Sequence, residues 1–124
     1  MTEDLFADRV AAVRQRFVSS LESKIARTAA ALPDLCGLSG EAVAAVAEAY
    51  RAMHGIVGIG RTVGFPATGH AAHEVEDVLR PPYHAGRGLT ADEILLLKFS
   101  LQALREVAAR ELQSCQTPRI EGVQ

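Results

Sequence analysis

Apolar residues recur along this chain at steps of three, four and seven, and no segment shows the two-residue alternation of a half-buried strand. This pattern predicts four helices, over about residues 3–32, 39–64, 66–80 and 90–112. Residues 81–88 contain two consecutive prolines and two glycines and are expected to form the longest irregular stretch. The first helix should bury a stripe of large apolar side chains: Phe6, Val10, Val13, Phe17, Leu21, Ile25 and Leu32.

The ends of these helices carry the residue types that begin and end helices. Ser39 is expected to cap the second helix, and Pro66 suits the first turn of the third. Thr90 and Glu93 form a capping-box pattern at the start of the fourth. Four amphipathic helices with short links predict an all-α fold, an antiparallel up-down four-helix bundle with a long first helix. We expect one domain over residues 1–115 and a flexible tail over residues 116–124.

Composition narrows the possible partners. The 124 residues suit one hydrophobic core, and the net charge of −2 lacks the basic excess that nucleic-acid binding requires. No apolar run approaches the roughly 20 residues of a membrane span, and the acidic N-terminus does not resemble a signal peptide. Cys36 and Cys115 fit no metal or redox spacing. We therefore expect a cytoplasmic monomer with reduced thiols that binds neither nucleic acid nor a membrane.

The second helix combines one histidine, His54, with a cluster of glycines that cost stability. Each glycine inside a helix is about 1 kcal/mol less favourable than alanine, so their presence needs a reason. On a helical wheel His54 points away from the apolar face and shares the outward face with Arg51, Gly58 and Arg61. The face opposite His54 is apolar and should be buried: Ala49, Met53, Ile56, Gly60 and Val63.

An exposed imidazole between two guanidinium groups suits the chemistry of anionic groups such as phosphoryl. Neutral imidazole is a good nucleophile near neutral pH, and Gly58 would leave room for a bulky visitor. Gly60 is expected to allow close helix packing, and Gly64 to end the helix. The alternative is that His54 is an ordinary surface histidine and the glycines serve packing alone. An exposed histidine with a glycine one turn away and arginines on both sides favours a functional role for His54 over this alternative.

The run from His54 to Gly64 resembles the core motif of the histidine-containing phosphotransfer (Hpt) family. That motif is His-x-x-Lys-Gly with a second glycine further along; His54, Gly58 and Gly64 are in register, and Val57 replaces the lysine. The resemblance implies an antiparallel four-helix bundle with the phosphoacceptor histidine exposed on the second helix. It extends over nearly the whole chain, from the first helix to about Leu112.

The third helix is similar to that of the phosphotransfer domain of chemotaxis histidine kinases. In that subgroup a histidine and a glutamate stand beside the phosphoacceptor, and His73 and Glu76 occupy these positions. The resemblance implies that Glu76 accepts a hydrogen bond from one imidazole nitrogen of His54 and leaves the other free to attack. His73 would be a neighbour in this network.

These observations together predict a phosphoryl carrier of a bacterial-type two-component phosphorelay, a phosphoprotein that is not a self-sufficient enzyme. A receiver-domain phosphoaspartate or a histidine kinase would donate to His54, and the receiver would bring the magnesium; no cofactor is expected in this chain. Arg61 would neutralise phosphoryl charge. The partner-binding surface is expected to comprise Arg51, Val57, Gly58, Ile59 and Arg61.

Two other functions stay open. Because Val57 cannot supply the charge of the usual lysine, the chain is alternatively a pseudo-Hpt interaction module that binds kinase or receiver without being phosphorylated. A helical metal or cofactor bundle is the other alternative, since His70 and His73 lie at a possible ligand spacing; we expect no metal, because no further ligand follows. Tyr50 is either part of a docking surface or a boundary core residue. His84 is expected at the surface.

Overall fold

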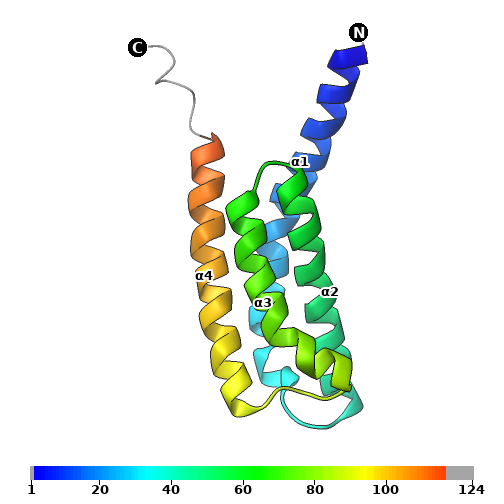
Figure 1. The fold of residues 1–124 in the computed structure, drawn as a ribbon, viewed down its shortest axis with the longest axis vertical. Coiled ribbons are helices and arrows are strands. Elements are labelled where there is room, and N and C mark those ends of the chain that lie inside the picture. The colour runs from blue at the N-terminus through cyan, green and yellow to red at the C-terminus, as the bar shows by residue number, and fades with distance from the viewer. Residues whose placement is uncertain (1, 117–124) are drawn as a thin grey trace.

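The computed structural model describes residues 2–116 and the side chains of residues 5–114. Its four α-helices run up and down as an antiparallel bundle, which confirms the predicted all-α fold (Figure 1). They are α1 (Thr2–Ala30), α2 (Gly40–Thr62), α3 (Pro66–Ala85) and α4 (Ala91–Gln116), with a short 3-10 helix, η1 (Leu32–Leu35), between the first two. The predicted flexible tail lies outside the described residues, except that Gln116 still belongs to α4.

The first half of α1 extends beyond the turn that joins α2 to α3 (Figure 1). Phe17, Leu21 and Ile25 are buried as predicted, but Phe6 is 70% exposed and Val10 is 39% exposed. The prediction that the whole stripe is buried was therefore wrong for its first part. The stripe has the right helical spacing, but over residues 2–116 the other helices do not extend far enough along α1 to cover its first part.

The predicted ends of α2 are confirmed. The Ser39 hydroxyl accepts a hydrogen bond from the Ala42 N–H at 3.1 Å, as an N-cap does. Gly64 has a φ of 95°, and the Phe65 N–H donates to the Gly60 carbonyl at 2.7 Å, so the helix ends in a Schellman motif. This turn places Phe65 in the core, where its ring packs against that of Phe17 with centroids 5.4 Å apart.

The third helix is longer than predicted, because Pro81 and Pro82 lie inside it instead of ending it. Proline removes a backbone donor and normally breaks a helix. Here Pro82 is buried and Tyr83 packs on the ring of Tyr50, so tertiary packing offsets the lost hydrogen bonds. The helix ends instead at Gly86, whose φ of 68° gives the left-handed cap. The last turns of α3 bend toward α2 in Figure 1.

The fourth helix contributes side chains that cap two helices, α4 itself and α3. Its predicted capping box forms: the Glu93 N–H donates to the Thr90 hydroxyl, and the Thr90 N–H donates to the Glu93 carboxylate at 2.8 Å. At the other end, the Glu111 carboxylate accepts hydrogen bonds from the backbone N–H groups of Ala67 and Thr68, at 3.0 and 2.8 Å. Glu111 thus supplies the cap that α3 lacks in its own sequence.

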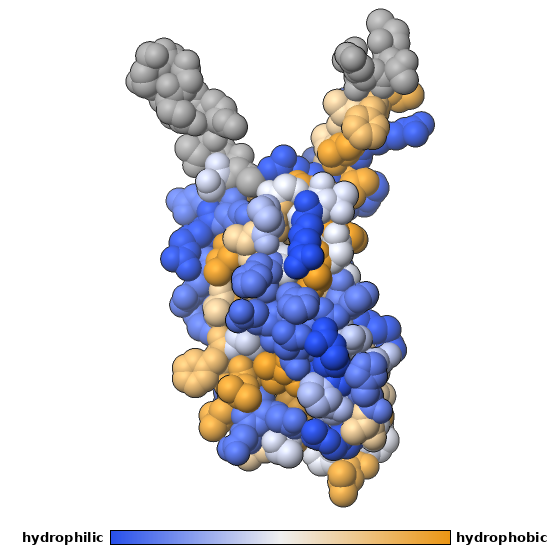
Figure 2. Space-filling model, in the orientation of Figure 1, coloured by the Kyte–Doolittle hydropathy of each residue, from blue (hydrophilic) through white to orange (hydrophobic). Residues whose placement is uncertain are grey.

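The core lies between the helices and is built from the apolar faces of all four. The most extensive contacts are those of α3 with α2 and with α4. Figure 2 shows apolar side chains that stay on the surface over the first turns of α4 and over the protruding start of α1. On α4 these are Leu95, Leu96 and Phe99, and Phe99 is 77% exposed. Cys36 is an exposed free thiol, and the side chain of Cys115 lies outside the described side chains.

Candidate functional site

His54 lies on the outward face of α2, as the wheel predicted. Its side chain is 72% exposed, while Met53 and Ile56 on the other face are completely buried. The burial of these neighbours fixes the rotation of the helix, because turning it would expose two large apolar side chains. The histidine is therefore presented to solvent by a rigid element.

One imidazole nitrogen of His54 is held by Glu76 of α3. The Nδ1 atom lies 2.6 Å from Oε2 of Glu76, and the Glu76 side chain is only 3% exposed. An ionised carboxylate only accepts hydrogen bonds, so with Glu76 ionised the proton of this bond belongs to Nδ1. In the neutral ring Nε2 then has the free lone pair, on the side of the ring away from the carboxylate. The predicted hydrogen-bond reach between these two residues is confirmed.

The second carboxylate oxygen of Glu76 faces Arg80, a residue that the sequence reasoning did not include. Nη2 of Arg80 lies 3.8 Å from Oε1 of Glu76, and Nη1 donates to Asp77. Hydrogen bonding to Asp77, and secondly to Tyr50, raises the pKa of Arg80 above its ordinary value. The available signal was spacing, because Arg80 follows Glu76 by one helical turn and so shares its face of α3.

Aromatic rings continue the surface beside His54. The ring of Tyr50 stacks on Tyr83 at 4.2 Å between centroids and lies nearly parallel to the imidazole of His54 at 6.1 Å. His84 packs edge-on against Tyr50. Tyr50 is half-buried against the core, so both interpretations of it apply in part: it is a boundary residue that also touches the site. Tyr83 was missed because the sequence placed it in a loop.

The glycines in and just after α2 have the different structural roles that were predicted for them. A Cβ at Gly58 would meet nothing within 4 Å, so the surface one turn beyond His54 is open. A Cβ at buried Gly60 would lie 3.3 Å from the Phe65 carbonyl oxygen and 3.5 Å from Cα of Gly69, which shows close packing of α2 against α3. Gly64 takes the left-handed conformation that ends the helix.

A comparison with protein families gives one match, in which the Hpt domain model covers residues 12–115. The chain belongs to the Hpt domain family. Comparisons with curated proteins and with solved structures gave no significant match. Hpt domains are phosphocarriers in two-component signalling that interact with histidine kinases and receiver domains.

The Hpt motif lysine is replaced by Val57, and the structure shows where the predicted neighbours of His54 lie. Val57 is half-buried and packs against the core. Ile59 is 40% exposed, and Arg51 and Arg61 are exposed. The aliphatic part of Arg61 lies over Gly69 of α3, where a Cβ would come within 3.2 Å of its Cγ. These side chains flank the open surface at Gly58, on the same helix as His54.

Over residues 2–116, His73 makes no direct contact with His54 and is linked to it only indirectly, through Asp77, Arg80 and Glu76. Its Nδ1 lies 3.5 Å from Oδ2 of Asp77, and no hydrogen bond or ion pair links it to His54 within the described residues. His70 likewise faces Glu74, at 3.5 Å. His73 lies one turn before Glu76 on the same side of α3, and its side chain pairs with Asp77 instead of His54. The described residues contain no group of three or more His, Cys, Asp or Glu side chains that could hold a metal ion.

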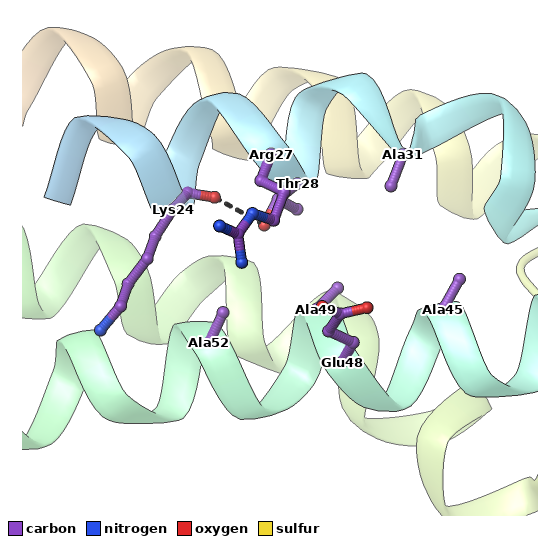
Figure 3. A pocket seen from close by; sticks show the side chains of 8 residues that line it. All are labelled: Lys24, Arg27, Thr28, Ala31, Ala45, Glu48, Ala49 and Ala52. Atoms are coloured by element: carbon purple, nitrogen blue, oxygen red, sulfur yellow. Dashed lines mark hydrogen bonds between the residues drawn. The ribbon is translucent and has the colours of Figure 1, made fainter. Parts of the chain in front are cut away.

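A small cleft lies between α1 and α2 (Figure 3). Its lining residues on α2 lie on the side of the helix away from His54. Ala45, Ala49 and Ala52 line its α2 side, and Figure 3 shows Lys24 and Arg27 reaching into it from α1. The cleft does not include the residues around His54, so it does not contribute to the Hpt site. Within the described part of the chain, no helix has the length and apolar character that spanning a bilayer demands.

Proposed function

We propose that this Hpt domain carries a phosphoryl group on Nε2 of His54. The observation that carries the proposal is the 2.6 Å hydrogen bond from Nδ1 of an exposed His54 to the buried Glu76. It fixes the tautomer in which Nε2 is an unprotonated nucleophile, and it leaves that atom accessible to a partner. A surface histidine without such a partner would exchange freely between its two tautomers.

The transfer step requires little chemistry from this chain. Nε2 attacks the phosphorus of a receiver-domain phosphoaspartate, the new N–P bond forms, and the bond from phosphorus to the aspartate oxygen breaks. The aspartate leaves as a carboxylate, and the proton on Nδ1 stays where it is. The imidazole ring gains positive charge during this step, so its hydrogen bond to the Glu76 carboxylate strengthens. Phosphoryl transfer depends mainly on this kind of positioning and electrostatics.

The proposed partners are a receiver domain, which would bring the magnesium, and a histidine kinase. Both must bring an active site to the face of α2 that carries His54. Gly58 leaves that face open, Ile59 offers apolar contact area, and Arg51 and Arg61 supply positive charge for an anionic group. The carrier does not phosphorylate itself. It exchanges the phosphoryl group with the receiver aspartate in either direction.

A pseudo-Hpt interaction module is the second candidate, and Val57 favours it. Its half-buried side chain cannot contribute charge beside His54. Such a module would bind a kinase or a receiver through the same face of α2 without accepting phosphate. The intact His54–Glu76 pair favours the carrier, because binding alone does not require a fixed tautomer.

The two candidates separate when the protein is incubated with phosphorylated receiver domains and, independently, with phosphoramidate as a small phosphoryl donor. The carrier acquires an acid-labile, base-stable phosphate that is absent from His54→Gln and unchanged in His70→Gln. His70 is a suitable control, because it is an exposed histidine, at 74%, on the neighbouring helix. Binding to receiver or kinase with no label from either donor establishes the interaction module instead.

A further inference from the structure

The buried Glu76 carboxylate presents an electrostatic problem that the His54 hydrogen bond alone does not solve. At 3% exposure it has lost most of its hydration, and a buried charge is stable only when it is paired and hydrogen-bonded. A lone carboxylate beside an imidazole favours the doubly protonated ring. That form has no lone pair on Nε2 and cannot attack phosphorus.

Arg80 is placed to solve this problem. Its Nη2 lies 3.8 Å from Oε1 of Glu76, the oxygen that His54 does not use. Within the described residues, it is the one Arg or Lys side chain that forms an ion pair with Glu76. The two partners therefore hold the two oxygens from different sides, and Arg80 provides the opposite charge.

Arg80 is itself held in place. Nη1 donates to Asp77, and hydrogen bonding to Asp77 and to the Tyr50 phenol raises its pKa, so it stays charged. Asp77 and Arg80 lie on successive turns of α3, and Tyr50 lies on α2, so the guanidinium is close to both helices that make the site. A side chain that Asp77 already holds loses less freedom when it contacts Glu76.

We propose that Arg80 is a positioning residue for the phosphoacceptor, acting through Glu76. Its guanidinium balances the Glu76 charge and fixes the carboxylate, so that His54 keeps its proton on Nδ1 and its lone pair on Nε2. The inference rests on the proposed function of His54 and deepens it. Other titratable groups face this cluster: Asp77, which pairs with both Arg80 and His73, and Tyr50, Tyr83 and His84 of the aromatic surface.

The test compares Arg80→Met with Arg80→Lys and with Arg110→Met. Methionine keeps the unbranched apolar stem and removes the charge, lysine restores the charge without the fork, and Arg110 is an exposed arginine on α4 away from the site. Two measurements are made on each folded protein. Long-range ¹H–¹⁵N NMR correlations report which imidazole nitrogen of His54 is protonated, and phosphoramidate labelling between pH 6 and 9 reports the rate of phosphorylation.

In Arg80→Met we expect more doubly protonated imidazole near neutral pH and about three- to tenfold slower labelling at pH 7. The rate should approach that of the wild type toward pH 9, where the extra proton is lost. Arg80→Lys should recover most of the rate, and Arg110→Met should behave as wild type. A mere loss of stability would not produce this dependence on pH.

Wild-type ring signals and a wild-type rate profile in Arg80→Met would overturn the role of Arg80. Absence of labelling in the wild-type protein contradicts the proposed function of His54 instead. The NMR measurement still decides the inference in that case, because it detects the charge and tautomer of the ring without phosphate.

Discussion

Replacing Glu76 with glutamine separates the role of its charge from the role of its shape. Glutamine keeps the size of the side chain and offers an amide oxygen that can accept the proton on Nδ1 of His54, but it removes the negative charge 2.6 Å from the ring. A hydrogen bond to a charged group contributes about 1.5–3 kcal/mol and a neutral one about 0.5–1.5 kcal/mol. The loss is therefore about 1–1.5 kcal/mol, and it acts most strongly when the ring becomes positive during transfer.

That free energy corresponds to a rate of His54 phosphorylation lowered about five- to thirteenfold. Stability should change in a different way. Glu76 is 3% exposed and its cation lies 3.8 Å away, so removing the buried charge also removes a desolvation penalty. We expect the free energy of unfolding of Glu76→Gln to stay within about 1 kcal/mol of the wild type. Glu76→Ala, which leaves Nδ1 without an acceptor, should be slower still.

The assay is phosphoramidate labelling under single-turnover conditions, with urea unfolding of the same preparations. His70→Gln serves as the control for nonspecific effects of a change on the polar face of α3. Labelling of Glu76→Gln at the wild-type rate would refute the electrostatic argument. A rate loss that parallels a large loss of stability would show that Glu76 acts on the fold and not on His54.

Three further predictions concern access, packing and pH. Gly58→Leu should fold normally, because a side chain there meets open space. It should slow transfer from a phosphorylated receiver at least about tenfold and leave phosphoramidate labelling unchanged, which kinetics with both donors would measure. Gly88→Ala should lower the free energy of unfolding by about 2 kcal/mol or more in urea titrations, since its Cβ would lie 2.6 Å from the Leu35 carbonyl oxygen. The Arg87 guanidinium lowers the pKa of Glu93 from 4.5 to about 2, so the stability that this pair contributes is present above about pH 4.5 and is lost as the pH falls toward 2. Unfolding measured over about pH 2–7 should therefore show a difference between wild type and Glu93→Gln that is constant above about pH 5 and shrinks in acid.

The sequence predicts the site well where local geometry determines it. The exposure of His54 follows from the apolar residues on the opposite face of α2, because a helix has one rotation that buries them. The hydrogen bond to Glu76 required more, since it joins two helices. Its prediction depended on the resemblance to the Hpt family, and periodicity alone would not have chosen Glu76 over Glu74.

Other features depend on tertiary packing that no local rule describes. The prolines at 81 and 82 predict a loop, yet burial of Pro82 and stacking of Tyr83 on Tyr50 keep α3 helical for another turn. That turn carries the aromatic part of the site, so the error about the loop also concealed Tyr83. The exposed start of α1 shows the opposite case, in which a correct helical stripe has nothing to cover it.

The placement of charge around His54 bears on the meaning of Val57. The resemblance to the Hpt motif implies a lysine, three residues after the histidine, that helps to hold the phosphoryl group. Here Arg80 is the cation that pairs with Glu76, on the carboxylate oxygen that His54 does not use. It supports the nucleophile and does not neutralise the phosphoryl oxygens.

In transfer from a receiver, the magnesium that we propose the receiver brings neutralises those oxygens, so the missing lysine matters less there. With a small donor that has no metal site, Arg51 and Arg61 of α2 have to supply that charge. A carrier built in this way depends on its partner for much of the phosphoryl stabilisation and supplies an oriented imidazole of its own, a division of roles that the geometry of His54, Glu76 and Arg80 favours.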